Sequence, residues 1–117
     1  EIQANSWLTD QELSIYAEEY TRNGFQGGLN WYRRGTTDMD IKSLEIFTDK
    51  TIDVPSCFIS GKSDWGVYQR PGAAERMNGQ VCTKMLNFEL IEGAGHWVQQ
   101  EQPEKTAEVL LKFFQGS

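Results

Sequence analysis

The 117-residue sequence is poor in the residues that build metal sites, since it has one histidine and two cysteines. Cys57 and Cys82 are far apart, form no Cys-x-x-Cys pair and have no histidine nearby, which excludes a zinc site. Cys57 lies in an apolar run, so we expect a buried free thiol there. A disulfide between the two cysteines is the alternative.

Basic residues are also in short supply. The chain has 11 of them against 17 acidic residues, a net charge of −6, and they are scattered along the sequence. Binding to nucleic acid or to anionic membranes needs a positive patch, so neither partner is expected. No stretch approaches the roughly 20 apolar residues that span a bilayer. No cofactor is expected either.

The sequence lacks an initiator methionine, and Glu1–Ser6 has neither the basic region nor the apolar run of a secretory signal. We therefore expect a processed chain or part of a longer one. The expected free thiol favours the cytoplasm, and a processed exported protein is the alternative. Apolar residues make up 38% and aromatic residues 12% of the sequence, so the chain can build a core. Its length fits one domain at most.

The N-terminal part predicts two helices. Thr9 and Glu12 have the spacing of a capping box, in which each side chain bonds the other residue's amide. An apolar face follows at helical spacing, and the helix should end near Asn23-Gly24. Residues 25–31 should open a second, short helix that carries Tyr32. The apolar face comprises Leu13, Tyr16, Ala17 and Tyr20.

The C-terminal part predicts two strands and two helices. Residues 54–60 read as a parallel strand that is buried on both faces and closed by Gly61, with Pro55 at its edge or first turn. Pro71 suits the first turn of a helix that runs to about Asn78. Residues 85–91 read as the second strand, and Pro103 opens a helix over about 103–115. The side chains expected to face the sheet from that last helix are Ala107, Leu110, Leu111 and Phe114.

This order of elements is half of an alternating α/β fold, because each strand is followed by a helix. We divide the chain into a helical lid segment (1–35), a polar connection (36–53) and an α/β part (54–117). Two parallel strands do not form a stable sheet alone. The pattern therefore indicates a missing part of the fold.

His96 is the main candidate for acid–base chemistry. It follows a Gly-Ala-Gly turn at the end of the second predicted strand, and Asp64 follows the first. Ligand sites of open α/β sheets lie at this edge, and a carboxylate there can orient an imidazole that acts as base. An ordinary imidazole is neutral at cellular pH and can accept a proton. The plainer interpretation of Asp64 is a turn residue or a helix N-cap.

Tyr32 is the candidate electrophile. A phenol donates a good hydrogen bond to an oxygen that gains negative charge. Ordinary aromatic packing of Trp31 and Tyr32 is the alternative, and the local sequence favours it.

Three motifs in this order suggest a family. Phe25–Arg33 is similar to the lid segment of epoxide hydrolases, which belong to the α/β-hydrolases. Gly61–Asp64 resembles their acid turn, and Gly95–Trp97 followed by Gln100–Glu104 resembles their catalytic-histidine turn and the start of the last helix. The resemblance covers nearly the whole chain, from about residue 7 to residue 114.

The resemblance implies a mechanism in which an aspartate attacks the epoxide and the resulting ester is hydrolysed. Tyr32 would then polarise the ring oxygen, His96 would activate water and Asp64 would orient His96. Neighbouring tryptophans would contact a small apolar, epoxide-like substrate. Haloalkanoate dehalogenases use the same aspartate nucleophile, histidine base and orienting acid, but the sequence around Tyr32 favours an epoxide substrate. The tryptophans in question are Trp31, Trp65 and Trp97.

The chain has no Gly-x-Asp-x-Gly or Gly-x-Ser-x-Gly turn to supply the nucleophile. The family's nucleophile, oxyanion loop and first lid tyrosine all precede the region that is present. One hypothesis is therefore that the chain is part of an epoxide-hydrolase-like enzyme. It would be inactive alone and would be completed by an N-terminal hydrolase piece. The alternative is a non-catalytic module that binds a small ligand or self-associates, most simply as a homodimer.

Overall fold

The structure is a computed structural model that describes residues 6–34 and 42–116. The chain divides into two compact units, Glu1–Asp49 and Lys50–Ser117. Part of the predicted connection, residues 36–41, and the first five residues lie outside the described ranges. The proposed division into lid, connection and α/β part stays a prediction.

Helix α1 (Asp10–Asn23) in the first unit begins at the predicted capping box. The Thr9 amide donates to Glu12 Oε2 (2.8 Å), and the Glu12 amide donates to Thr9 Oγ1 (3.3 Å). The helix ends at Gly24, which has a φ of 69° and donates its amide to the Tyr20 carbonyl (2.8 Å). A residue with a side chain would be strained at that φ, so both predicted ends of this helix are confirmed.

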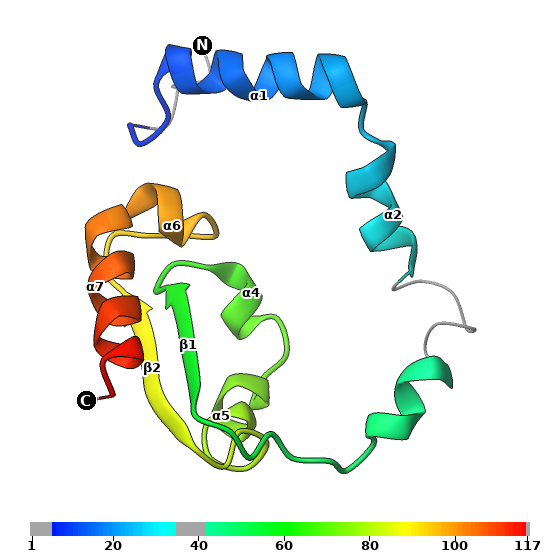
Figure 1. Cartoon of the computed structure of the whole chain (residues 1–117), viewed down its shortest axis with the longest axis vertical. Coiled ribbons are helices and arrows are strands. Elements are labelled where there is room, and N and C mark those ends of the chain that lie inside the picture. Colours follow the sequence, from blue (N-terminus) through cyan, green and yellow to red (C-terminus); the bar gives the residue numbers. More distant parts are fainter. Residues whose placement is uncertain (1–5, 35–41, 117) are drawn as a thin grey trace. The chain divides into compact units, whose positions relative to one another are not determined.

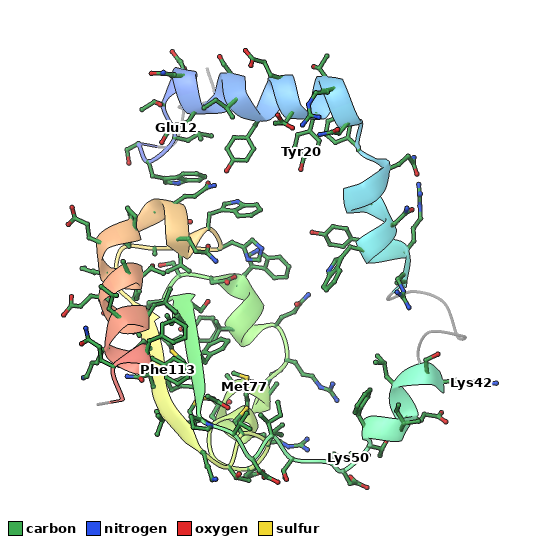
Figure 2. The ribbon with its side chains drawn as sticks, in the orientation of Figure 1. Glu12, Tyr20, Lys42, Lys50, Met77 and Phe113 are labelled. Carbon is green, nitrogen blue, oxygen red and sulfur yellow. The ribbon has the colours of Figure 1, made fainter. Side chains whose placement is uncertain are left out.

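Helix α2 (Gln26–Arg34) follows and carries Tyr32, which confirms the predicted second helix. The Tyr20 ring, labelled in Figure 2, stacks on Phe25 with 4.4 Å between ring centroids, and this contact spans the junction of the two helices. Neither α1 nor α2 contains a buried residue. A short 3-10 helix, η1 (Glu45–Phe47), follows near the end of the unit.

The second unit is built on two parallel strands, β1 (Ser56–Gly61) and β2 (Met85–Ile91). Phe58 pairs with Phe88 in the register, and their rings stack at 5.0 Å. The register pairs Gly61 with Ile91, so both strands end at the same edge. The parallel pair confirms the prediction.

Two details of β1 differ from expectation. The strand begins at Ser56, so Pro55 lies just before it, where a missing amide hydrogen costs no ladder bond. Its first four residues are half-buried rather than covered on both faces. The cover is incomplete because β1 pairs only with β2 among the described residues.

Two short helices, α4 (Trp65–Tyr68) and α5 (Ala73–Met77), connect β1 to β2. The helix predicted from Pro71 to about Asn78 corresponds to α5, whereas α4 was not predicted. Gly72 has a φ of 79°, a left-handed conformation that no α-helix contains, so α5 starts at Ala73, two residues after Pro71. Figure 1 shows α4 and α5 on one side of the strands and α7 on the other.

Helices α6 (Val98–Glu101) and α7 (Pro103–Phe114) complete the unit, and Pro103 opens α7 as predicted. The predicted inner face of α7 was wrong, since Thr106 is buried and Val109 and Phe113 are half-buried. The Thr106 hydroxyl lies 2.9 Å from the Gln102 carbonyl and 3.2 Å from that of Val98, which holds this side of α7 inward. The residues that were expected inside are exposed instead: Ala107, Leu110, Leu111 and Phe114.

The core of the second unit lies next to the ends of the strands. Ile91, Ala94 and Val98 are buried together, and Ile59 packs against them. These residues link the end of β2, the turn after it and α6, so the best-packed part of the unit supports that turn. No helix in the described ranges is long and apolar enough to cross a membrane.

Candidate active site

The turn after β1 places Asp64. Its Oδ1 accepts the Gly66 amide (2.8 Å), so the residue is the N-cap of α4. Its Oδ2 accepts the Ser60 hydroxyl (3.0 Å), and the residue is only 8% exposed. The N-cap interpretation of Asp64 is therefore correct. It does not exclude a second role, because a carboxylate has lone pairs left to accept further bonds.

The turn after β2 places His96 opposite this carboxylate. Its Nδ1 lies 3.1 Å from Asp64 Oδ1, and about half of its side-chain surface is exposed. An ionised carboxylate only accepts hydrogen bonds, so the neutral imidazole carries its proton on Nδ1. The Nε2 lone pair can then accept a proton from another group.

Backbone contacts lock the two turns together. The Lys62 amide donates to the Ile91 carbonyl (2.9 Å), and the Ser63 amide donates to that of Ala94 (3.0 Å). A Cβ atom on Gly61 would lie 2.2 Å from the Gly95 carbonyl oxygen, so only glycine allows this close approach. The distance between Asp64 and His96 is therefore set by the backbone as well as by the side chains.

The charge of Asp64 is stabilised by its hydrogen bonds. Burial alone would raise the pKa of this carboxyl. The hydrogen bonds from the Gly66 amide, the His96 ring and the Ser60 hydroxyl each lower it, and together they outweigh burial. The pKa of Asp64 is therefore held below its ordinary value. An ionised carboxylate is what is needed to hold Nδ1–H and to stabilise the imidazolium that forms when Nε2 takes a proton.

Two of the predicted tryptophans flank the imidazole. The Trp65 ring stacks near His96 with 6.0 Å between centroids, and Trp97 contacts it edge-on at 5.2 Å. Both tryptophans are more than half exposed. They place apolar surface beside the imidazole.

Tyr32 and Trp31 lie on α2 in the first unit, and they are 72% and 80% exposed. The structure thus brings together four of the six predicted site residues, all in the second unit. The grouping of Tyr32 and Trp31 with them stays a prediction.

Three residues that position the pair were not predicted as part of the site. Ser60 bonds Asp64, Gly61 permits the contact between the turns, and Glu101 bonds the turn that carries His96. Ser60 and Gly61 end β1, and Gly61 is the first residue of the acid turn, a signal that could have found both. Glu101 lies in the stretch Gln100–Glu104 that resembles the family, but nothing singled out its side chain, because a helical glutamate is usually a surface residue.

Cys57 and Cys82 are both free thiols, and Cys57 is half-buried rather than buried. Burial, with a smaller contribution from Glu89, raises the pKa of the Cys57 thiol, so it stays protonated and is a poor nucleophile. Within residues 6–34 and 42–116, no three His, Cys, Asp or Glu side chains form a group that could hold a metal ion.

Comparison with known proteins gives a consistent result. No protein-family profile matches the chain. Epoxide hydrolase A of Mycobacterium tuberculosis is 41% identical over 112 residues, which is 95% of this chain and 33% of that protein. Epoxide hydrolase B of the same organism is 35% identical over 111 residues, 95% of this chain and 30% of that protein.

Solved structures agree. The crystal structure of epoxide hydrolase A from Mycobacterium thermoresistibile superposes with a TM-score of 0.84 and 38% identity, covering 99% of this chain and 35% of that one. Potato (Solanum tuberosum) epoxide hydrolase I gives a TM-score of 0.76 and 34% identity, covering 96% of this chain and 35% of that one. The chain spans about one third of the length of the relatives it matches. By sequence and by fold, it corresponds to the C-terminal part of an epoxide-hydrolase-like α/β-hydrolase.

Proposed function

We propose that this chain supplies the base, the residue that orients it and a lid tyrosine for the hydrolysis of an epoxide through an ester intermediate. The observation that carries the proposal is the contact between His96 Nδ1 and Asp64 Oδ1 at the shared edge of β1 and β2. In this proposal the nucleophilic carboxylate comes from outside the chain, and the chain alone is inactive.

The first step would form the ester. The nucleophilic carboxylate attacks a ring carbon of the epoxide, the carbon–oxygen bond breaks, and the ring oxygen gains negative charge. Tyr32 would donate its phenolic hydrogen bond to that oxygen. A donor placed where charge develops is worth roughly 10²–10³ in rate.

The second step would release the diol. The ring oxygen takes a proton from solvent and becomes the first hydroxyl of the diol. His96 Nε2 takes a proton from water as the water oxygen attacks the ester carbonyl, and the imidazolium gives this proton to the alkyl oxygen as it leaves, which forms the second hydroxyl. The nucleophilic carboxylic acid then releases its proton to solvent and is again a carboxylate. Asp64 stabilises the imidazolium during this step. Trp65 and Trp97 support an apolar substrate, because their rings lie against the imidazole.

A chimera tests this proposal. The matching C-terminal third of the Mycobacterium tuberculosis epoxide hydrolase A is replaced by this chain, and turnover of styrene oxide is measured. We expect turnover in the chimera, and a loss of roughly 10²–10⁴-fold in His96→Ala because the general base is removed. Tyr32→Phe should lose roughly 100-fold. The matched control is Tyr20→Phe on α1, which should leave turnover unchanged.

Intact-mass measurement separates the two steps. The His96→Ala chimera should still form the ester but hydrolyse it slowly, so its mass should increase by the mass of one styrene oxide. Tyr32→Phe should slow the appearance of this adduct. Turnover that is unchanged in His96→Ala would refute its assignment as base.

A second candidate function rests on a different observation. The exposed face of α7 carries Leu110, Leu111 and Phe114, which are 39%, 60% and 76% exposed. Exposed apolar surface of this kind favours association. A non-catalytic, self-associating module would show a native mass that is a multiple of its intact mass, and Leu111→Glu would reduce it to the monomer value. A monomeric native mass in the unsubstituted chain would remove this candidate.

A further inference from the structure

Glu101 makes an unusual pair of contacts at the turn that carries His96. Its Oε2 accepts the Gly95 amide at 2.7 Å, and its Oε1 accepts the Trp97 amide at 2.9 Å. These two amides belong to the residues on either side of His96. One carboxylate thus holds the chain immediately before and immediately after the imidazole.

The two bonds restrict the backbone from which the imidazole projects. The Trp97 amide belongs to the peptide unit that follows His96, and the Gly95 amide belongs to the unit that precedes Gly95. Hydrogen bonds to an ionised carboxylate are roughly twice as strong as neutral ones. A glycine at 95 would otherwise allow this segment many conformations. The carboxylate therefore restricts the turn where the sequence makes it most adaptable.

Helix capping alone does not explain this arrangement. Trp97 is the N-cap of α6, so the bond to its amide satisfies one donor at the start of that helix. The bond to Gly95 lies two residues before the N-cap, outside the helix, and it is the shorter of the two. A carboxylate that only capped α6 would have no need to reach Gly95.

The neighbouring residue holds the same turn from another side. Gln102 Nε2 donates to the Gly93 carbonyl at 3.3 Å. Glu101 is half-buried, and the Val98 side chain beside it is buried in the core. The turn is therefore held by side chains from the end of α6, and these rest on the best-packed part of the unit.

We propose that Glu101 is a positioning residue: its carboxylate clamps the amides of Gly95 and Trp97 and so holds His96 against Asp64. The functional meaning of this clamp rests on the proposed role of His96 as base. The structural part of the proposal is that the hydrogen bond between His96 and Asp64 depends on Glu101, which bonds the backbone of the turn and neither of these two side chains.

The clamp is tested by NMR on the whole chain with the variants Glu101→Ala and Glu101→Gln. The first readout is hydrogen exchange of the Gly95 and Trp97 amides, which should quicken by roughly tenfold or more in Glu101→Ala because local opening becomes easier. Glu101→Gln should lie between, since a carboxamide keeps one acceptor oxygen. The matched control is Glu104→Gln, an exposed glutamate in the first turn of α7.

The second readout is the pKa of Asp64, followed through its carboxyl ¹³C shift. The bond from His96 lowers the pKa of this carboxyl, so releasing His96 should raise it. Removing the negative charge of Glu101 should by itself lower the pKa of Asp64, because one fewer nearby carboxylate favours ionisation of Asp64. A rise in the Asp64 pKa in Glu101→Ala therefore reports the lost contact and not the lost charge.

Each outcome decides the proposal. Faster exchange at both amides together with a raised Asp64 pKa, with β1 and β2 amide shifts unchanged, supports the clamp. Faster exchange with no rise in the Asp64 pKa overturns it and leaves Glu101 as a cap of the turn. If Glu101→Ala loses the β1 and β2 signals, the same two readouts are taken from Glu101→Gln. If both variants lose these signals, Glu101 has a general structural role and the proposal is overturned. None of these readouts needs turnover, so failure of the proposed hydrolase function would be seen separately.

Discussion

The two units of the chain are built by different kinds of interaction. In the first unit, the hydrogen bonds of α1 and α2 join residues close in sequence, such as Thr9 with Glu12 and Arg33 with Gln26. In the second unit, turns about 30 residues apart in sequence are joined, as in the bonds of Lys62 to Ile91 and of His96 to Asp64. The second unit has a buried core, whereas α1 and α2 bury no residue.

This difference shows which structures local sequence signals can define and which need contacts between residues far apart in the sequence. Capping and helical periodicity are enough to define α1, whose ends are set by Thr9 and Gly24. The pair of Asp64 and His96 needs two strands in register and two turns that touch. Changes in the second unit should therefore have larger effects on stability than changes in the first.

A methyl group at Gly61 should have the largest effect. In Gly61→Ala the new carbon would overlap the backbone of both Ala94 and Gly95, so the two turns would have to separate. We expect a loss of about 4 kcal/mol or more in the stability of the second unit. Urea unfolding followed by amide NMR signals of each unit measures it.

The matched control is Gly28→Ala in α2, where the added carbon would have no atom within 4 Å apart from its chain neighbours and the backbone of its own helix. Alanine is the better helix former, so this change should stabilise α2 by roughly 0.5–1 kcal/mol. Equal effects of the two substitutions would contradict the account of how the units differ.

Truncation of a core side chain should come next. Ile91 is 6% exposed and lies at the centre of the small core, so Ile91→Ala should cost about 3 kcal/mol. Ile15 on α1 is 58% exposed, and Ile15→Ala should cost less than about 0.5 kcal/mol. The same urea experiment measures both. A cost at Ile15 as large as at Ile91 would mean that α1 is buried in solution.

Loss of the cap should have a smaller and local effect. Thr9→Ala removes the side-chain oxygen that accepts the Glu12 amide, and we expect α1 to lose about 1 kcal/mol. Far-ultraviolet circular dichroism and α1 amide exchange report it. Ser14→Ala is the control, because the Ser14 hydroxyl donates to the Asp10 carbonyl and caps no helix end.

The pH dependence of the second unit should be the smallest effect, because burial opposes the hydrogen bonds at Asp64. The pKa of Asp64 is lowered on folding, so its contribution is complete above the ordinary value of 3.8. It is lost as the pH falls through the lower pKa of the folded state. Asp64→Asn should flatten the acid side of the stability curve in that range. An unchanged curve would show that the carboxylate is not stabilised on folding.

Much of the fold followed from the sequence, for reasons that are local. Thr9, Glu12 and Pro103 mark helix starts by their chemistry, and they were interpreted correctly. The position of Asp64 and His96 at a shared strand edge followed from the order of the elements. The resemblance in these turns and in the lid segment identified the relatives.

The rest depended on hydrogen bonds and close contacts to the backbone, which the pattern of side chains does not show. The prediction of the inner face of α7 was wrong because Thr106, a polar residue, is buried and bonded to the carbonyls of Val98 and Gln102. Apolar periodicity cannot reveal a buried threonine of this kind. The need for glycine at position 61 follows only from its close approach to Ala94 and Gly95, which are distant in sequence. Glu101 was missed because its partners are the backbone amides of Gly95 and Trp97, and a pattern of side chains does not reveal such bonds.

The most direct test of the central claim is the tautomer of the one histidine, read from long-range ¹H–¹⁵N NMR at pH 8, where an ordinary imidazole is neutral. The account expects the proton of His96 on Nδ1, bonded to Asp64, and an unprotonated Nε2. In Asp64→Asn this preference should weaken or disappear. A wild-type ring protonated on Nε2, or the same mixture of tautomers in both proteins, would contradict the claim that the two turns build a base.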